Sequence, residues 1–291
     1  MGNGYTRFSL GTPHPFVFFH HLETRESRIL PRSVTTDTMG ELDYGGVSFS
    51  WDGQMSGLYY LDSGEGRDEL YHLRLSDGRV RGVEDCADCA SVDVDEPLGL
   101  AAYIRVGQGE RARQEWLEVR RWNKGVSAGV LVTVPVPSES FAVKLSPTGK
   151  RASYMGEQVE IEDERGYEWP VRLRHYVDLA TGTTIKLNEN YLRDPWVTDD
   201  VVLEPDREMP RVWKYDLVTG RRELFVEFAL GALLFDEEEQ REGKRYAIWS
   251  AMIGGRHRQY LLFEWRHARG PSYGTLMVAD LRCALQQAQG K

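Results

Sequence analysis

The chain has 291 residues, of which 41% are hydrophobic, and its 36 basic and 45 acidic residues give a net charge of −9. This composition can form a packed core and excludes a mainly disordered chain. The negative charge disfavours binding to nucleic acid or anionic lipid, so we expect neither a nucleic-acid partner nor a membrane partner.

The N-terminus and the apolar runs indicate where the protein resides. No run approaches the roughly 18 apolar residues of a membrane span. The first ten residues, MGNGYTRFSL, lack a basic stretch followed by an apolar one. We therefore expect a cytoplasmic protein. A periplasmic or secreted protein whose signal sequence had been removed would look the same.

Short apolar strands joined by polar turns recur along the chain, which is typical of a repeat fold. Most of these turns carry a glycine, which accepts the positive φ of a tight hairpin turn, although the first copy has lost it. The turn glycines at 78, 125, 182 and 220 are 47, 57 and 38 residues apart, close to the length of a four-stranded propeller blade. In chain order the copies are FVFFHHLETRESRIL (16–30), LYHLRLSDGRVRGV (70–83), WLEVRRWNKGVSAGVLV (116–132), YVDLATGTTIKL (176–187) and KYDLVTGRRELF (214–225).

A second kind of turn precedes several of these hairpins. It occurs in SWDGQ (50–54), SPTGKR (146–151) and EGKR (242–245), each followed by a short strand that contains an aromatic residue. No such inner turn is recognisable between residues 93 and 105. The two patterns together predict one blade as strand, inner turn, strand, loop, strand, outer turn, strand.

The inner turns read approximately Ser-Pro-Asp-Gly-Lys and the outer turns Asp-Leu-x-Thr-Gly, and in both the sequence resembles the TolB-like (WD-like) β-propeller repeat family. The match is best over 145–187, weaker over 196–225 and 48–83, and weakest elsewhere. The resemblance implies one all-β domain, a β-propeller of six four-stranded antiparallel blades, or five if the first segment completes the last blade. The expected blades are 5–31, 45–83, 90–134, 139–188, 194–226 and 228–281.

Helix is scarce in this sequence. The best candidate is a short C-terminal helix over 280–289 (DLRCALQQAQ), which has good helix formers and an Asp near its start. The stretch 235–242 is a weaker candidate, because its run of acids also suits a solvated loop.

Three cysteines are present, and Cys86 and Cys89 form a CxxC pair. Zinc normally takes four ligands, and no second CxxC pair accompanies this one. A thioredoxin-like site needs a βαβ unit, which the pattern does not contain. We therefore expect two thiols in a loop or a local disulfide, with neither a metal site nor a cofactor.

Catalytic motifs occur without the structural context that they need. Residues 125–129 match G-x-S-x-G, but a nucleophile elbow requires a helix after Ser127, and here a β-like run follows. In propeller glycosidases, paired carboxylates act around the central channel. Candidates on inner strands are Asp43, Asp95, Asp199 and Asp200, whereas Asp178 and Asp216 repeat at matching turn positions and should cap the turns.

Aromatic and basic residues in or beside long loops are candidates for partner binding, because Trp, Tyr and Arg dominate interface hot spots. These residues are Tyr167, Trp169, Arg256, His257, Arg258, Trp265 and Arg266. The sequence thus favours a non-enzymatic binding module or scaffold for a protein or peptide, which uses the propeller's face loops and channel mouth. The alternative is a carbohydrate- or lactone-active hydrolase or lyase with carboxylates at the channel. The oligomeric state stays open.

Overall fold

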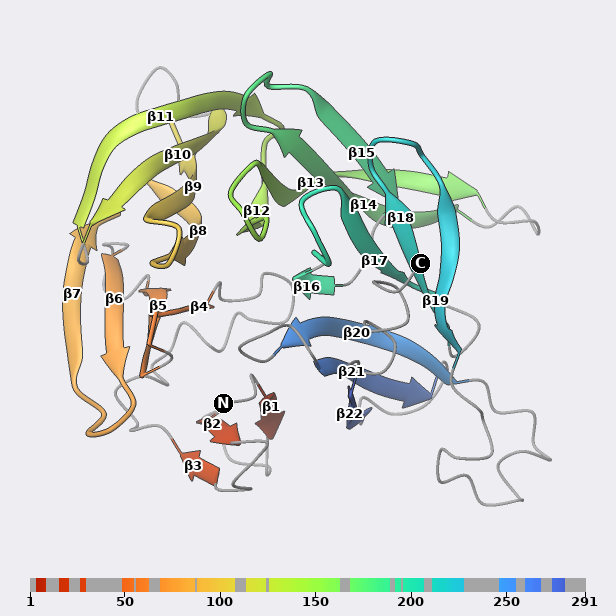
Figure 1. Ribbon diagram of the computed structural model, residues 1–291, viewed down its shortest axis with the longest axis horizontal. Coiled ribbons are helices and arrows are strands. Elements are labelled where there is room, and N and C mark those ends of the chain that lie inside the picture. Colours follow the sequence, from red (N-terminus) through yellow and green to blue (C-terminus); the bar gives the residue numbers. More distant parts are fainter. Residues whose placement is uncertain are drawn as a thin grey trace. The chain divides into compact units, whose positions relative to one another are not determined.

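The computed structural model describes residues 4–8, 16–20, 27–29, 49–54, 56–62, 69–86, 88–107, 114–123, 126–162, 168–188, 192–194, 196–206, 211–227, 246–254, 260–267 and 274–280. Within these ranges the chain forms 22 strands and no helix, which confirms the predicted all-β class (Figure 1). The chain divides into two compact units, which we describe separately. The larger unit comprises Tyr5–Phe19 and Ser27–Glu189, and the smaller comprises Met1–Gly4, His20–Glu26 and Asn190–Lys291.

Three four-stranded antiparallel sheets follow one another in the larger unit, each with its strands paired in chain order. They are preceded by a sheet of three short strands, β1 (Gly4–Phe8), β2 (Phe16–His20) and β3 (Ser27–Ile29). The second sheet contains β4 (Phe49–Trp51), β5 (Gly57–Asp62), β6 (Glu69–Arg74) and β7 (Val80–Asp85). The third contains β8 (Cys89–Asp95), β9 (Leu100–Val106), β10 (Glu115–Asn123) and β11 (Val126–Val136). The fourth contains β12 (Phe141–Leu145), β13 (Arg151–Glu162), β14 (Glu168–Asp178) and β15 (Thr184–Asn188).

The β8–β11 sheet has an apolar core on each of its faces. Successive strand residues point to opposite faces, so Ala101 and Tyr103 of β9 pack toward the β4–β7 sheet, whereas Ala102 and Ile104 pack toward the β12–β15 sheet. The first strand of each sheet also contacts the first strand of the next, β4 with β8 and β8 with β12. Neighbouring sheets are thus joined both by apolar cores and along their first strands.

The glycine turns have the conformation that the sequence predicts. Gly78, Gly149, Gly182 and Gly220 have φ between 70° and 72°, a region that side chains with a Cβ rarely enter. In the outer turns, Gly182 N–H donates to Asp178 C=O at 2.8 Å, and Gly220 N–H donates to Asp216 C=O at 2.9 Å. Gly78, Gly182 and Gly220 therefore close their hairpins as expected, whereas Gly125 lies outside the described residues.

Residues 93–105, where the sequence has no recognisable inner-turn motif, do contain a turn. The chain turns between β8 and β9, where Gly99 has a φ of 63° and its N–H donates to Glu96 C=O at 3.0 Å. The Asp95 carboxylate accepts the Leu98 N–H at 3.0 Å. The turn is not recognisable in the sequence because it reads Asp-Glu-Pro-Leu-Gly, which differs from the Ser-Pro-Asp-Gly-Lys-like inner turns.

The smaller unit holds two sheets. One contains β17 (Val201–Pro205), β18 (Arg211–Asp216) and β19 (Arg222–Glu227), paired antiparallel in chain order. The other contains β16 (Leu192–Asp194), β20 (Tyr246–Gly254), β21 (Tyr260–His267) and β22 (Gly274–Asp280), with β16 parallel to β20. Asp280, the expected start of the C-terminal helix, is the last residue of β22. Residues 281–289 and 235–242 lie outside the described residues.

Candidate functional site

Asp93 joins the first strands of three successive sheets. Ser50 of β4 donates its hydroxyl to Asp93 Oδ1 at 2.8 Å and accepts the Val94 N–H at 2.9 Å. From β12, Lys144 Nζ lies 2.6 Å from Asp93 Oδ1, and the Leu145 N–H donates to Oδ2 at 2.8 Å. Both carboxylate oxygens are thus engaged by donors from the neighbouring sheets. Such saturation stabilises a buried charge and suits packing better than acid–base chemistry.

A second polar group closes the turn between β4 and β5. Asp52 Oδ1 accepts the Ser56 N–H at 2.7 Å, and Oδ2 accepts the Ser56 hydroxyl at 2.9 Å and lies 3.1 Å from His72 Nε2. Burial opposes ionisation of Asp52, but the hydrogen bonds from His72 and Ser56 outweigh burial and lower its pKa. A Cβ at Gly57 would lie 2.5 Å from the Leu73 carbonyl oxygen, so only glycine fits there.

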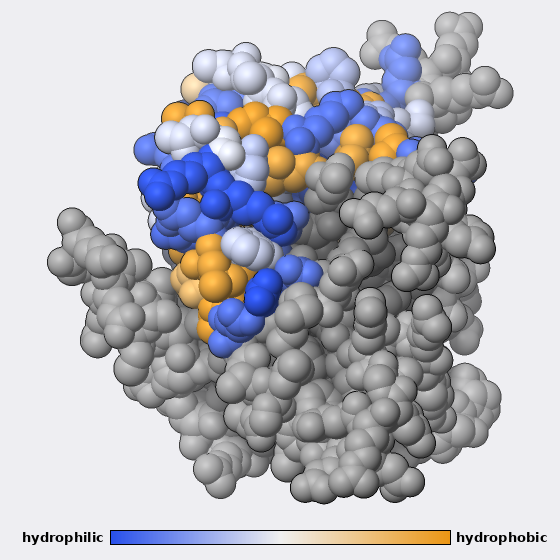
Figure 2. All heavy atoms as spheres, turned by 90° about the vertical axis from the view of Figure 1, so that its right-hand side faces the viewer, coloured by the Kyte–Doolittle hydropathy of each residue, from blue (hydrophilic) through white to orange (hydrophobic). Residues whose placement is uncertain are grey.

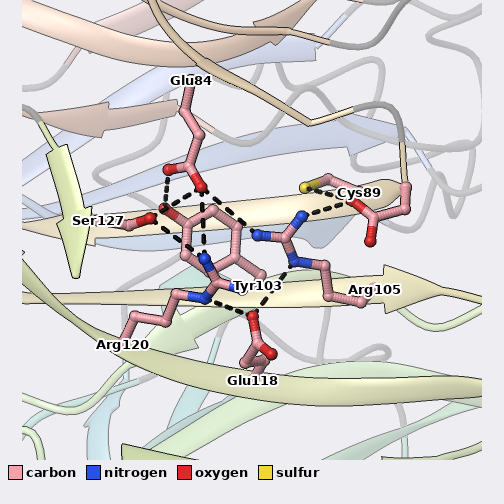
Figure 3. Close-up of polar contacts among 8 residues, drawn as sticks. Glu84, Cys89, Tyr103, Arg105, Glu118, Arg120 and Ser127 are labelled. Atoms are coloured by element: carbon pink, nitrogen blue, oxygen red, sulfur yellow. Dashed lines mark hydrogen bonds and ion pairs between the residues drawn. The ribbon is translucent and has the colours of Figure 1, made fainter. Parts of the chain in front are cut away.

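A cluster of buried and half-buried charges lies between β7 and strands β9–β11 (Figure 3). The Arg105 side chain is 7% exposed and pairs with Asp88 at 2.5 Å, with Glu118 at 3.4 Å and with Glu84 at 3.6 Å. Burial acts to lower the Arg105 pKa, but its acidic neighbours, among them Asp88, outweigh burial and raise it. The guanidinium also lies 4.7 Å from the centre of the Tyr103 ring.

Arg120 completes this cluster. Its Nε lies 2.5 Å from Glu118 Oε1 and its Nη1 lies 3.6 Å from Glu84 Oε1. Figure 3 shows both guanidinium groups beside the Tyr103 ring, with Glu84 on one side and Glu118 on the other. The Tyr103 hydroxyl donates to Glu84 Oε2 at 2.9 Å. Each charge therefore has an opposite partner, as a buried ionic network requires.

The CxxC pair lies beside this cluster as two free, buried thiols, without the local disulfide that the sequence left open. The Cys89 N–H donates to the Cys86 carbonyl at 2.7 Å, which closes a tight turn between β7 and β8. A hydrogen bond with Cys86, together with burial, raises the pKa of the Cys89 thiol. A thiol held in the protonated form is a poor nucleophile and a poor metal ligand.

A buried histidine connects β13, β14 and β15. His175 Nδ1 lies 3.1 Å from the Tyr154 hydroxyl, and its Nε2 lies 2.6 Å from Glu157 Oε2. Lys186 Nζ is 2.6 Å from Glu157 Oε1. Burial lowers the His175 pKa, although the Glu157 carboxylate opposes this effect. The His175 side chain is only 2% exposed and so is closed to substrate.

The G-x-S-x-G match is not a nucleophile elbow. Ser127 lies in β11, opposite Trp122 of β10, and its hydroxyl donates to Glu84 Oε1 at 2.8 Å. A serine in a regular strand lacks the exposed, strained turn that activates such a nucleophile.

The candidate binding residues are placed only in part. Trp169 lies in β14 opposite Ile161, and Trp265 and Arg266 lie in β21 opposite Ile248 and Ala247, all described here by their backbone. Tyr167, Arg256, His257 and Arg258 lie outside the described residues.

The candidate channel acids are placed only in part. Asp95 caps its own turn, as described above. Asp199 is buried and Asp200 is half-buried, both beside β17, whereas Asp43 lies outside the described residues.

Three charged groups were not predicted as site residues, namely Asp93, Arg105 and Glu118. A signal was present, because Asp93 and Arg105 interrupt the otherwise apolar strands CASVDVD and LAAYIRV. Charged residues in such strands are buried only when they are paired. The partners of Asp93 lie on other sheets, and those of Arg105 lie on β7, in the turn before β8 and on β10, so neither set can be read from the sequence.

The described residues give two further results. They contain no group of three His, Cys, Asp or Glu side chains that could hold a metal ion. Nor do they include a helix long and apolar enough to cross a membrane.

Figure 2 shows one face of the molecule. Over its coloured part, hydrophobic residues alternate with hydrophilic ones.

Comparison with known proteins identifies the fold. No protein-family profile matches the chain, and no curated protein matches it by sequence. Among solved structures, TolB from Agrobacterium tumefaciens matches with a TM-score of 0.55 and 15% identity, over 91% of this chain and 84% of that one. TolB from Acinetobacter baumannii matches with a TM-score of 0.53 and 11% identity, over 96% of this chain but 61% of that one. The chain therefore has the fold of a TolB-like β-propeller.

Proposed function

We propose that the protein is a non-enzymatic binding module that recognises a protein or peptide through the loops of its propeller faces and the mouth of its channel. The observation that carries this proposal is the engagement of Asp93. Its two oxygens accept hydrogen bonds from Ser50 and Leu145 and pair with Lys144, so the carboxylate joins sheets rather than facing a substrate. Within the proposal the whole chain is one domain of six blades.

The other polar clusters support the same proposal. Asp52 fixes a turn, Arg105 is surrounded by carboxylates, and His175 is buried against Tyr154 and Glu157. Each of these three groups contacts side chains of its own sheet or of the next one, which ties the strands together. A rigid sheet scaffold that carries variable loops is a common way to build a recognition surface.

To test this proposal, a random library of displayed peptides is selected for binding to the immobilised chain. The most enriched peptide is then synthesised, and its affinity is measured by calorimetry. We expect Trp169→Ala to lower the affinity for that peptide by about tenfold or more, as for interface hot spots. The double change Trp265→Ala and Arg266→Ala should have an effect of the same size. Val218→Ser, at the exposed tip of the β18–β19 turn, is the matched control and should bind like the unchanged chain. Failure to enrich any peptide, or equal loss in all three variants, would contradict the proposal.

A further inference from the structure

One outermost strand, β11, differs in charge from the other outermost strands. β7 carries Arg81, Glu84 and Asp85, β15 carries Lys186, and β19 carries Arg222, Glu223 and Glu227. β11 reads VSAGVLVTVPV, and none of its eleven residues is charged. Charges on outermost strands normally prevent pairing with another chain. β11 lacks this protection by charged side chains.

The outward side of β11 is apolar and exposed. The register with β10 shifts twice, which leaves Gly129 and Leu131 as extra residues and breaks the alternation of the strand. As a result, the adjacent residues Val130 and Leu131 are both at the surface, 51% and 46% exposed. Thr133 and Pro135 are also exposed, so the outward side chains around the regular part of the strand are all uncharged.

The regular part of β11 also presents its backbone. Val132–Val136 pairs with β10 without a shift, and among the described residues no strand pairs with the other edge of β11 (Figure 1). Pro135 has no N–H and lies opposite Trp116, which suits a position whose backbone nitrogen points away from β10. Thr133, two residues earlier, then also directs its N–H and C=O outward.

We propose that this edge pairs with the same edge of a second copy of the chain, antiparallel about a two-fold axis at Thr133. The partner that such an edge accepts is an extended, uncharged, β-branched strand, and β11 itself meets that description. Two-fold pairing places Thr133 opposite Thr133 of the partner subunit, a favourable cross-strand pair, and Leu131 near Pro135 of the partner subunit. Two copies with a net charge of −9 each repel one another. The electrostatic repulsion is smallest where they approach through a strand without charged residues.

Sedimentation velocity over a range of concentrations of the full chain tests this proposal. We expect a reversible dimer, and Leu131→Lys should raise its dissociation constant by more than about tenfold, because the two-fold axis brings two lysines into one interface. Leu224→Lys is the matched control. Leu224 is 45% exposed and lies on the outermost strand β19, but that strand is charged, so the dimer should persist.

Cross-linking tests the position of the axis. In a Cys283→Ser background, Thr133→Cys should form a covalent dimer with diamide, as two thiols lose their protons and two electrons pass to the reagent to give one disulfide. Leu224→Cys should stay uncross-linked, and Cys86 and Cys89 are buried. A chain that stays monomeric at all accessible concentrations overturns the proposal, as does a dimer that both lysine variants affect equally. A monomer whose β11 edge binds only a foreign apolar peptide also overturns it.

Discussion

The Nε2 atom of His175 lies 2.6 Å from Oε2 of Glu157, and a bulge in β13 makes this contact feasible. The register between β13 and β14 skips Gly156 and Glu157, so Glu157 turns toward the histidine ring. A Cβ on Gly156 would lie only 2.5 Å from the same Nε2 atom. The absence of a side chain at residue 156 therefore makes room for the contact between His175 and Glu157.

Replacement of Gly156 by alanine should displace the His175 ring. We expect Gly156→Ala to lower the free energy of unfolding by about 1–3 kcal/mol, as overpacking does in buried sites. Gly82→Ala is the matched control, because its Cβ would meet nothing closer than 3.7 Å. Urea denaturation followed by tryptophan fluorescence measures both variants. Equal stabilities would show that the ring is not confined as described.

The buried imidazole should make stability depend on pH. Burial lowers the His175 pKa in the folded chain, so below about pH 6.5 the unfolded chain binds a proton that the folded chain resists. Stability from this group is therefore fully present above that pH and decreases as the pH falls below it. Between pH 7.5 and 5.5 the unchanged chain should lose more thermal stability than His175→Gln, with the other six histidines common to both. Identical losses in the two proteins would contradict this account.

Removal of the Arg105 charge should lower the free energy of unfolding far more than removal of an exposed arginine does. Arg105→Met removes the cation that Glu84, Asp88 and the buried Glu118 share, so we expect it to lower the free energy of unfolding by about 3–5 kcal/mol. Arg221→Met is the control. The Arg221 side chain is 75% exposed and pairs with Glu223 at 2.7 Å. Its replacement should therefore lower the free energy of unfolding by less than about 1 kcal/mol. Chemical denaturation compares the two variants, and similar losses would mean that the buried cluster is not an ionic network.

The repeated turn residues Asp178 and Asp216 should contribute equally to the stability of the folded chain. Asp178 Oδ1 accepts the N–H groups of Ala180 and Thr181, both at 3.1 Å. Asp216 Oδ1 accepts those of Val218 and Thr219, at 2.9 and 2.8 Å. We expect Asp→Ala at either position to cost about 0.5–1.5 kcal/mol, since two backbone donors lose their acceptor.

Asp→Asn at these two positions is the matched control. The amide keeps one acceptor oxygen, so thermal unfolding should show a smaller loss than for Asp→Ala. An alanine variant as stable as the unchanged chain would show that these carboxylates do not hold the turns.

The local features of the fold could be predicted from the sequence. Gly182 and Gly220 sit in repeated Asp-Leu-x-Thr-Gly segments, and short-range turn chemistry alone fixes their positive φ. The capping role of Asp178 and Asp216 was predicted for the same reason and is confirmed. Where the turn chemistry differs, as at Gly99, the motif is not recognisable in the sequence although the backbone reverses.

The contacts between sheets could not be predicted. Ser50 and Asp93 are 43 residues apart, and Asp93 and Lys144 are 51 apart, so no local pattern relates them. The two bulges in β11 depend on its pairing with β10, which the alternation of side chains does not reveal. Sequence therefore identified the repeating unit, and packing between units determined which polar groups meet.

The most direct test of this account is a crystal structure of the full chain that resolves the first strands of all its sheets. We expect the sheets to circle a common axis, with β4, β8 and β12 innermost and the Asp93 carboxylate between Ser50 and Lys144. Sheets stacked as a sandwich would contradict the propeller fold. An Asp93 carboxylate that faces an open channel, with a second carboxylate about 5–9 Å away, would contradict the binding-module account and indicate a hydrolase.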